Sequence, residues 1–198
     1  MTHVSEEARG KRSSASDSDA LTGLPARSAF VTRLTARAER ALLDGTPFGL
    51  CIVDFDQFKK INLSHGPTCG DAVLRDVAQR LVRTITAVLP DDAEPLVGRY
   101  DGNAFGVLVE SRTPQELAAA AEALRHAVMT SVLPTGSRIT ASVGAVQARI
   151  GEGSDALLVR AEQALYLAKQ FGRDRVEIGR APTPPRAGGT VLALRRSA

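Results

Sequence analysis

A carboxylate at the end of an apolar run is the first group in this chain that could do chemistry. Asp54 directly follows residues 48–53, a continuous apolar run typical of a strand buried on both faces. Ligands gather at the carboxyl ends of such strands in α/β folds, and carboxylate oxygens are ligands that magnesium prefers. We therefore expect Asp54 to reach a ligand or metal site, or, in the plainer alternative, to cap the next turn.

A predicted hairpin turn is the second candidate. Short apolar runs at residues 95–98 and 105–109 flank Asp101, Gly102 and Asn103, a pattern that predicts a β-hairpin. The Asn103 amide can offer one neutral oxygen, but it carries no charge and cannot act as a base. Ala104 offers no polar group, so the turn has little catalytic capacity of its own.

Four further polar side chains have a structural interpretation when their residue types and positions are taken alone. Asn62 is a candidate cap of a helix or turn, and Asp71 is a candidate N-cap of a helix that begins at Ala72. Lys169 and Arg173 lie four residues apart at the end of a predicted helix. Cations at that position complement the helix dipole.

The elements that must position these groups follow from apolar periodicity and turn residues. Thr113 is predicted as the N-cap of the helix at residues 114–129, and Gly172 as a C-terminal cap of the helix at residues 154–171. Helices and strands interleave around the hairpin, which predicts an α/β (α+β) fold with a ferredoxin-like βαββαβ core, a mostly antiparallel sheet flanked by helices. The predicted helices are residues 25–43, 72–88, 114–129 and 154–171, and the strands outside the hairpin are 48–53, 138–146 and 175–178.

Composition limits the classes of protein that this chain can belong to. Its 198 residues, 43% of them hydrophobic, predict one domain at residues 19–179, with a disordered tail at 1–18 and a flexible tail at 180–198. No apolar run approaches the roughly 20 residues that span a bilayer, so we expect no membrane partner. Cys51 and Cys69 lack metal-ligand spacing and read as thiols of a cytoplasmic protein. A net charge of +3 is too small to indicate nucleic-acid binding.

Six short motifs follow one another along the chain. They are Asp19-Ala-Leu-Thr-Gly-Leu24, Asp54-Phe-Asp-Gln-Phe-Lys-Lys-Ile-Asn62, Gly70-Asp71, Arg99-Tyr100, Asp101-Gly-Asn-Ala-Phe105, and Ala164-Leu-Tyr-Leu-Ala-Lys169 with Gly172-Arg173. In this order and at this spacing they make the chain resemble the GGDEF family of diguanylate cyclases, which join two GTP molecules into cyclic di-GMP. The resemblance runs from Asp19 to about Ile178, and the family has the predicted core, shared with class III nucleotidyl cyclases.

The resemblance assigns roles to individual residues. It implies that Asp54 and the carbonyl of Phe55 bind Mg²⁺, and that Asn62 and Asp71 hydrogen-bond the guanine edge. It also implies phosphate contacts for three cationic side chains, namely Lys59, Lys169 and Arg173.

The signature hairpin departs from the family pattern. The family has Gly-Gly-Asp/Glu-Glu-Phe where this chain has Asp101, Gly102, Asn103, Ala104 and Phe105, so a neutral amide and a methyl replace two carboxylates. Losing one catalytic group often costs about 10²–10⁴ in rate, so we expect a weakened metal site and no intact catalytic residue. Asp101 is either a hairpin-turn residue that catalysis no longer constrains to be glycine, or a replacement metal ligand.

A second departure concerns regulation. Many family members carry an inhibitory Arg-x-x-Asp site for cyclic di-GMP shortly before the signature. Residues 92–95 lack that arginine, and a guanidinium is needed to pair with the ligand's phosphates. We therefore expect no product inhibition through this segment.

These observations favour a degenerate GGDEF protein of cyclic-di-GMP signalling, catalytically inactive, that binds a guanine nucleotide such as GTP or a protein partner. One alternative is an active diguanylate cyclase with a remodelled metal site, which would work as a homodimer because each half-site presents one GTP to the other. Another is an interaction module that binds no nucleotide.

Overall fold

The computed structural model describes residues 17–88, 96–131 and 138–179. The predicted tails, except for Asp17 and Ser18, and the segment 92–95 lie outside the described residues. Within the described part, no helix is both long enough and apolar enough to cross a membrane.

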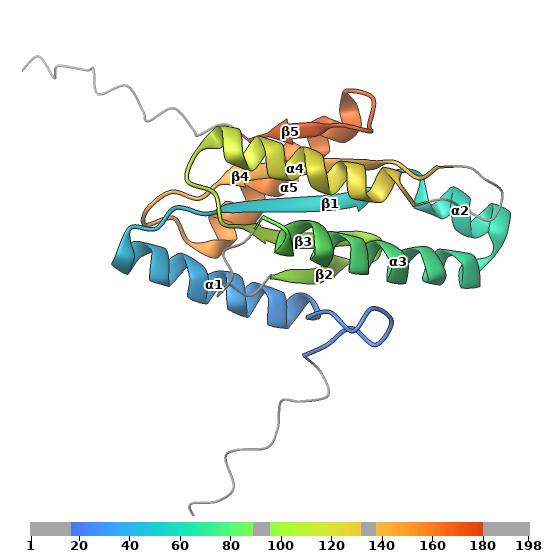
Figure 1. Cartoon of the computed structure of the whole chain (residues 1–198), viewed down its shortest axis with the longest axis horizontal. Helices are drawn as coiled ribbons and strands as arrows, with labels where there is room; N and C mark the ends of the chain where they lie inside the picture. Colours follow the sequence, from blue (N-terminus) through green and yellow to red (C-terminus); the bar gives the residue numbers. More distant parts are fainter. Residues whose placement is uncertain (1–16, 89–95, 132–137, 180–198) are drawn as a thin grey trace, which may run out of the picture.

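A five-stranded sheet forms the centre of the described part, in the order β2-β3-β1-β4-β5 (Figure 1). β1 pairs antiparallel with both β3 and β4, β2 and β3 form an antiparallel hairpin, and β4 pairs parallel with β5. The predicted mostly antiparallel sheet is therefore confirmed, and its first four strands have the order of the ferredoxin-like core. The strands are β1 (Gly49–Phe55), β2 (Val97–Asp101), β3 (Ala104–Val109), β4 (Ala141–Gln147) and β5 (Val176–Ile178).

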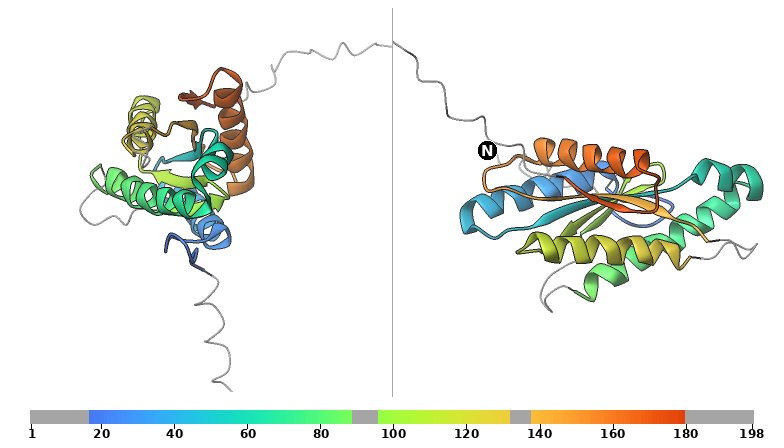
Figure 2. Two further views of the ribbon diagram at one scale, coloured as in Figure 1. Left: turned by 90° about the vertical axis from the view of Figure 1, so that its right-hand side faces the viewer. Right: turned by 90° about the horizontal axis from the view of Figure 1, so that it is seen from above.

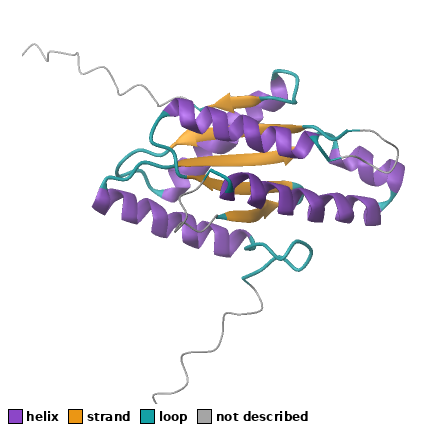
Figure 3. Ribbon diagram, in the orientation of Figure 1, coloured by secondary structure: helices purple, strands orange, loops and turns teal. Residues whose placement is uncertain are grey.

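Helices cover both faces of the sheet (Figures 2 and 3). α1 (Arg27–Asp44) and α5 (Ser154–Gln170) pack on one face, and α3 (Pro67–Thr86) and α4 (Pro114–Met129) pack on the other. The short helix α2 (Phe58–His65) lies beyond the carboxyl end of β1 (Figure 1).

The alternation of side chains along β1 explains both cores. Cys51 and Val53 are buried with α3 and α4, whereas Leu50 and Ile52 are buried with α1 and α5. This confirms the strand buried on both faces. By the same alternation, Asp54 points toward the face that α5 covers.

The caps at helix ends were predicted with mixed success. α4 has the predicted bounds, and the Thr113 hydroxyl accepts a hydrogen bond from the Glu116 amide at 3.2 Å. By contrast, α3 begins at Pro67 rather than Ala72, so Asp71 lies inside the helix and is not its N-cap. Phe171 is the C-cap of α5, and Gly172 follows it with a φ of 114°, while the Arg173 amide donates to the Ala168 carbonyl at 3.0 Å. A positive-φ glycine directly after the C-cap, with this hydrogen bond, is the Schellman arrangement, so the predicted role of Gly172 at the end of α5 is confirmed.

Candidate functional site

The end of β1 and the β2–β3 turn meet through the side chain of Asn103. Its Nδ2 donates to Asp54 Oδ1 at 3.1 Å and to the carbonyl oxygen of Phe55 at 3.0 Å. Because Asp54 pairs with Ala104 in the antiparallel register, the adjacent turn residue Asn103 lies within hydrogen-bond distance of both oxygens. The two groups predicted to hold a metal are therefore hydrogen-bonded to one amide nitrogen.

Lys169 completes this cluster from α5. Its Nζ lies 2.9 Å from the same Asp54 Oδ1, and the Asp54 side chain is only 16% exposed. Burial raises the pKa of Asp54 above its ordinary value, although the ammonium of Lys169 and the amide of Asn103 act in the opposite direction. The charge of Asp54 is balanced by a cation that belongs to the protein.

The donor set does not fit a pair of bound divalent cations. Among the described residues, no group of three or more His, Cys, Asp or Glu side chains is arranged to hold a metal. Asp54 supplies the single carboxylate of the cluster, and its Oδ1 already accepts from Asn103 and Lys169. Magnesium requires near-octahedral oxygen coordination and loses water reluctantly, so this cluster is a poor substitute for its hydration shell.

Arg99 fixes the position of the hairpin turn. Its guanidinium donates to the Gly102 carbonyl oxygen, at 2.7 Å from Nε, and its Nη1 lies 3.3 Å from Asp19 Oδ1. Asp19 also accepts hydrogen bonds from the Thr22 amide and hydroxyl. Burial raises the pKa of Asp19, but these hydrogen bonds and Arg99 outweigh it, and the pKa lies below its ordinary value. The first motif thus holds the signature hairpin, a role that the sequence reasoning missed.

Asp101 occupies the exposed side of the hairpin. Its side chain makes no hydrogen bond or ion pair with the residues that the structure describes. Its role as a replacement metal ligand therefore stays a prediction.

Asp56 is a second residue whose role the sequence reasoning missed. This buried carboxylate accepts hydrogen bonds from the Thr140 hydroxyl, the Ser142 hydroxyl and the Asp174 amide, at 2.7, 2.7 and 3.0 Å. Asp174 and its neighbour Arg173 both have positive φ, 45° and 65°. Asp56 therefore holds in place the strained turn that carries Arg173. The signal was the second acid of Asp54-Phe55-Asp56, two residues after the first.

The residues predicted to contact guanine lie on α2 and α3. Asn62 is inside α2, and Asp71 is in the second turn of α3. Asn62 Oδ1 is buried and accepts no hydrogen bond from any described residue. A Cβ atom on Gly70 would lie 1.9 Å from that oxygen, so the absence of a side chain at Gly70 makes room for it.

Three more predicted site residues have side chains without a hydrogen-bond or ion-pair partner among the described residues. Lys59 and Arg173 are exposed, and Asp71 is partly exposed. None of the three side chains forms a hydrogen bond or ion pair within the described part of the chain. The structure thus brings Asp54, Phe55, Asn103 and Lys169 into one cluster. Lys59, Asn62, Asp71 and Arg173 make no hydrogen bond or ion pair to it.

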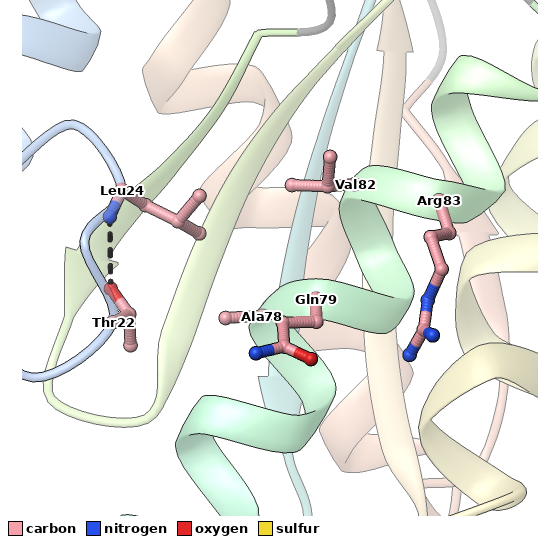
Figure 4. A pocket seen from close by; sticks show the side chains of 6 residues that line it. All are labelled: Thr22, Leu24, Ala78, Gln79, Val82 and Arg83. Carbon is pink, nitrogen blue, oxygen red and sulfur yellow. Dashed lines mark hydrogen bonds between the residues drawn. The ribbon is translucent and has the colours of Figure 1, made fainter.

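A hollow of about 300 Å³ lies between the N-terminal loop and α3 (Figure 4). Its lining is mainly aliphatic, with Arg83 as the one charged side chain among the lining residues, and it includes none of the predicted site residues. Because this hollow contains none of the predicted binding residues, the candidate site remains at the end of β1 and the hairpin turn. The lining residues are Thr22, Leu24, Ala78, Gln79, Val82 and Arg83.

Comparison with protein families gives one match over most of the chain. The sequence model described as "Diguanylate cyclase, GGDEF domain" matches residues 16–175. Diguanylate cyclase DgcP of Pseudomonas aeruginosa is 34% identical over 163 residues, which cover 81% of this chain and 23% of that protein. The response regulator PleD of Caulobacter vibrioides is 36% identical over 170 residues, covering 82% and 36%. The chain therefore spans about a quarter to a third of the length of these relatives.

Solved structures agree with the sequence comparison. The GGDEF domain of DgcB from Caulobacter crescentus, solved in complex with c-di-GMP, superposes with a TM-score of 0.75 at 31% identity, covering 86% of this chain and 99% of that one. Diguanylate cyclase SiaD of Pseudomonas aeruginosa, solved in complex with its activator SiaC, gives a TM-score of 0.73 at 34% identity, covering 83% and 62%.

Proposed function

This chain belongs to the GGDEF domain family of diguanylate cyclases, and from that premise we propose that it is a catalytically silent member that binds a guanine nucleotide in cyclic-di-GMP signalling. The proposal separates two capacities that an active cyclase combines. One is recognition of the nucleotide, and the other is stabilisation of the charge that develops on the reacting phosphate.

The observation that carries the proposal is the contact of Asn103 with Asp54 and Phe55. Formation of cyclic di-GMP requires attack of a 3′-hydroxyl on an α-phosphate, and such reactions depend on positioning and on metal-assisted charge stabilisation. Here the amide nitrogen of Asn103 lies 3.1 Å from Asp54 Oδ1 and 3.0 Å from the Phe55 oxygen. Neither Asn103 nor Ala104 brings a negative charge to anchor a metal.

Recognition of the nucleotide is supported by groups that lack partners. An unpaired buried acceptor costs about 1–3 kcal/mol, and Asn62 Oδ1 is such an acceptor within the described residues. If the side chain turns away from Gly70 toward a bound base, a donor of that base recovers the cost. The exposed cations Lys59 and Arg173 suit the phosphates of the same ligand.

A turnover assay and a binding assay test the two halves of the proposal. The purified chain is incubated with GTP and Mg²⁺ or Mn²⁺, and the products are separated by chromatography; we expect no cyclic di-GMP. Calorimetry should show GTP binding, with ATP as the matched control ligand that lacks the guanine edge. Cyclic di-GMP that disappears in Asp54→Ala would establish the alternative of an active cyclase. No GTP binding would favour the alternative of an interaction module.

A further inference from the structure

We propose that the Asn103 amide and the Lys169 ammonium take the place of divalent cations beside Asp54, so that the chain binds nucleotide phosphates through protein cations alone. This inference rests on the proposed function for the identity of the ligand. It goes further in stating how the anion is held, and its first test needs no nucleotide.

The orientation of the Asn103 amide is the first argument. An amide nitrogen carries two hydrogens, and here each points to one oxygen, Asp54 Oδ1 at 3.1 Å and the Phe55 carbonyl at 3.0 Å. If the amide were turned over, its own oxygen would face two acceptors and the contacts would become repulsive. The neighbours therefore hold the amide with its positive end where a metal ion would need to bind.

The charge balance is the second argument. Asp54 is the one carboxylate of the cluster, and Lys169 Nζ lies 2.9 Å from the oxygen that also accepts from Asn103. A divalent cation would have to displace the amide and then lie close to an ammonium group. The divalent cation and the Lys169 ammonium would repel each other. Because the Asp54 side chain is only 16% exposed, water would screen this repulsion less than at the protein surface.

The donors left over are the third argument. An ammonium group has three hydrogens, and Lys169 uses one toward Asp54 while remaining 33% exposed. The exposed Lys59 and Arg173 add two more cations that bind no described residue. Asp56 holds the turn of Arg173 through the Asp174 amide at 3.0 Å, so this guanidinium starts from a fixed backbone position.

The first experiment measures Mn²⁺ binding to the free protein by electron paramagnetic resonance. We expect the unmodified chain to leave Mn²⁺ free, and Asn103→Asp, which restores a second carboxylate, to raise Mn²⁺ affinity by about tenfold or more. Asp155→Asn removes an exposed carboxylate at the start of α5 and serves as the control without effect. Mn²⁺ binding by the unmodified chain that Asp54→Asn abolishes would overturn the proposal. The measurements on the unmodified chain and on Asp54→Asn therefore decide the proposal even if Asn103→Asp does not fold.

The second experiment measures GTP affinity by calorimetry in excess EDTA and in excess MgCl₂. We expect binding to persist in EDTA, to weaken by about tenfold or more in Lys169→Ala because a charge-assisted hydrogen bond is lost, and to be at least as tight in Asp54→Asn. Binding that requires Mg²⁺ would contradict the inference while leaving the proposed function intact. No GTP binding in either buffer would refute the proposed function and the phosphate-binding half of the inference, whereas the Mn²⁺ measurements would still decide whether the Asn103 amide and the Lys169 ammonium exclude divalent cations.

Discussion

Two asparagines of the candidate site differ in whether their side-chain amides have hydrogen-bond partners. Asn103, at the β2–β3 turn, has its amide nitrogen shared between two oxygens of the protein. Asn62, in α2, has a buried oxygen that accepts no hydrogen bond from the described residues. At the hairpin end of the candidate site, groups of the protein satisfy one another, whereas at the α2–α3 end the Asn62 oxygen is left without a donor among the described residues.

The difference shows that the two ends of one site can diverge separately. Substitutions in the signature hairpin remove charge from the end where metal chemistry takes place in an active cyclase. Asn62 lies on α2, and Gly70 and Asp71 lie on α3, so substitutions in the hairpin do not alter the spacing of these three residues. Loss of activity therefore does not require loss of the binding surface.

The largest expected effect comes from restoring the hairpin. The triple variant Asp101→Gly, Asn103→Asp, Ala104→Glu should raise cyclic di-GMP formation by about 10² or more, because each lost catalytic group costs about 10²–10⁴. Product is measured by chromatography after incubation with GTP and Mg²⁺. The same variant with Asp54→Asn added should lose the gain. A silent triple variant would show that the α2–α3 end is defective as well.

A clash at the α2–α3 end should have the next largest effect. In Gly70→Ala the new Cβ would lie 1.9 Å from Asn62 Oδ1 and 3.1 Å from Phe58 Cζ, and overpacking of this kind costs about 1–3 kcal/mol. Urea unfolding measures the loss, and calorimetry should show weaker GTP binding. Thr68→Ala, at an exposed position in the same helix, is the control and should stay within about 0.5 kcal/mol. An unfolding midpoint unchanged by Gly70→Ala would mean that Asn62 is not packed tightly there.

The pH dependence of stability distinguishes the carboxylates at the two sides of the hairpin. The pKa of Asp54 is raised, so the folded state binds its proton more tightly, and stability is lost as pH rises from 3.8 through the folded pKa. Asp54→Asn should therefore raise the urea midpoint at neutral pH, with a gain that shrinks in acid.

Asp19 provides the contrast of opposite sign. Its pKa is lowered, so it contributes stability above 3.8 that is lost as pH falls through the folded pKa. Asp19→Asn should lower the midpoint at neutral pH, and this loss should also shrink in acid. Equal signs for the two variants at neutral pH would contradict the assignment.

The smallest effect is a change in the reactivity of one thiol. Burial raises the pKa of Cys51 to about 12, so it should not react with N-ethylmaleimide in the folded protein. Cys69 is partly exposed and precedes Gly70, so mass spectrometry should find a single adduct there. GTP should slow its formation. Labelling at an unchanged rate in saturating GTP would place the nucleotide elsewhere.

Local patterns in the sequence predicted most of the fold. The bounds of α4 follow from the Thr113 cap, from Pro114 and from an apolar stripe within one helix. The start of α3 was missed because periodicity was read from Ala72, whereas the helix begins at Pro67, where a proline suits the first turn. The separate helix α2 was not predicted at all.

The candidate site was less predictable, because its contacts join distant parts of the chain. Asn103 is 49 residues from Asp54, and no periodicity within either segment indicates which atom of the amide faces the carboxylate. The hydrogen bond from Arg99 to Asp19 joins residues that are 80 positions apart in the sequence. Motif matching identified these residues but not their pairing, which depends on the register of β1 and β3.

The contacts of Asp56 have a consequence for how the carboxyl-terminal part of the sheet opens. Residues 140, 142 and 174 all donate to this buried carboxylate, and removing a partner from a buried charge is expensive. The three-residue strand β5, which alone would fray, is therefore coupled to β1 and β4. Amide hydrogens of this corner should exchange with solvent together, in one cooperative unit, and not peel back residue by residue.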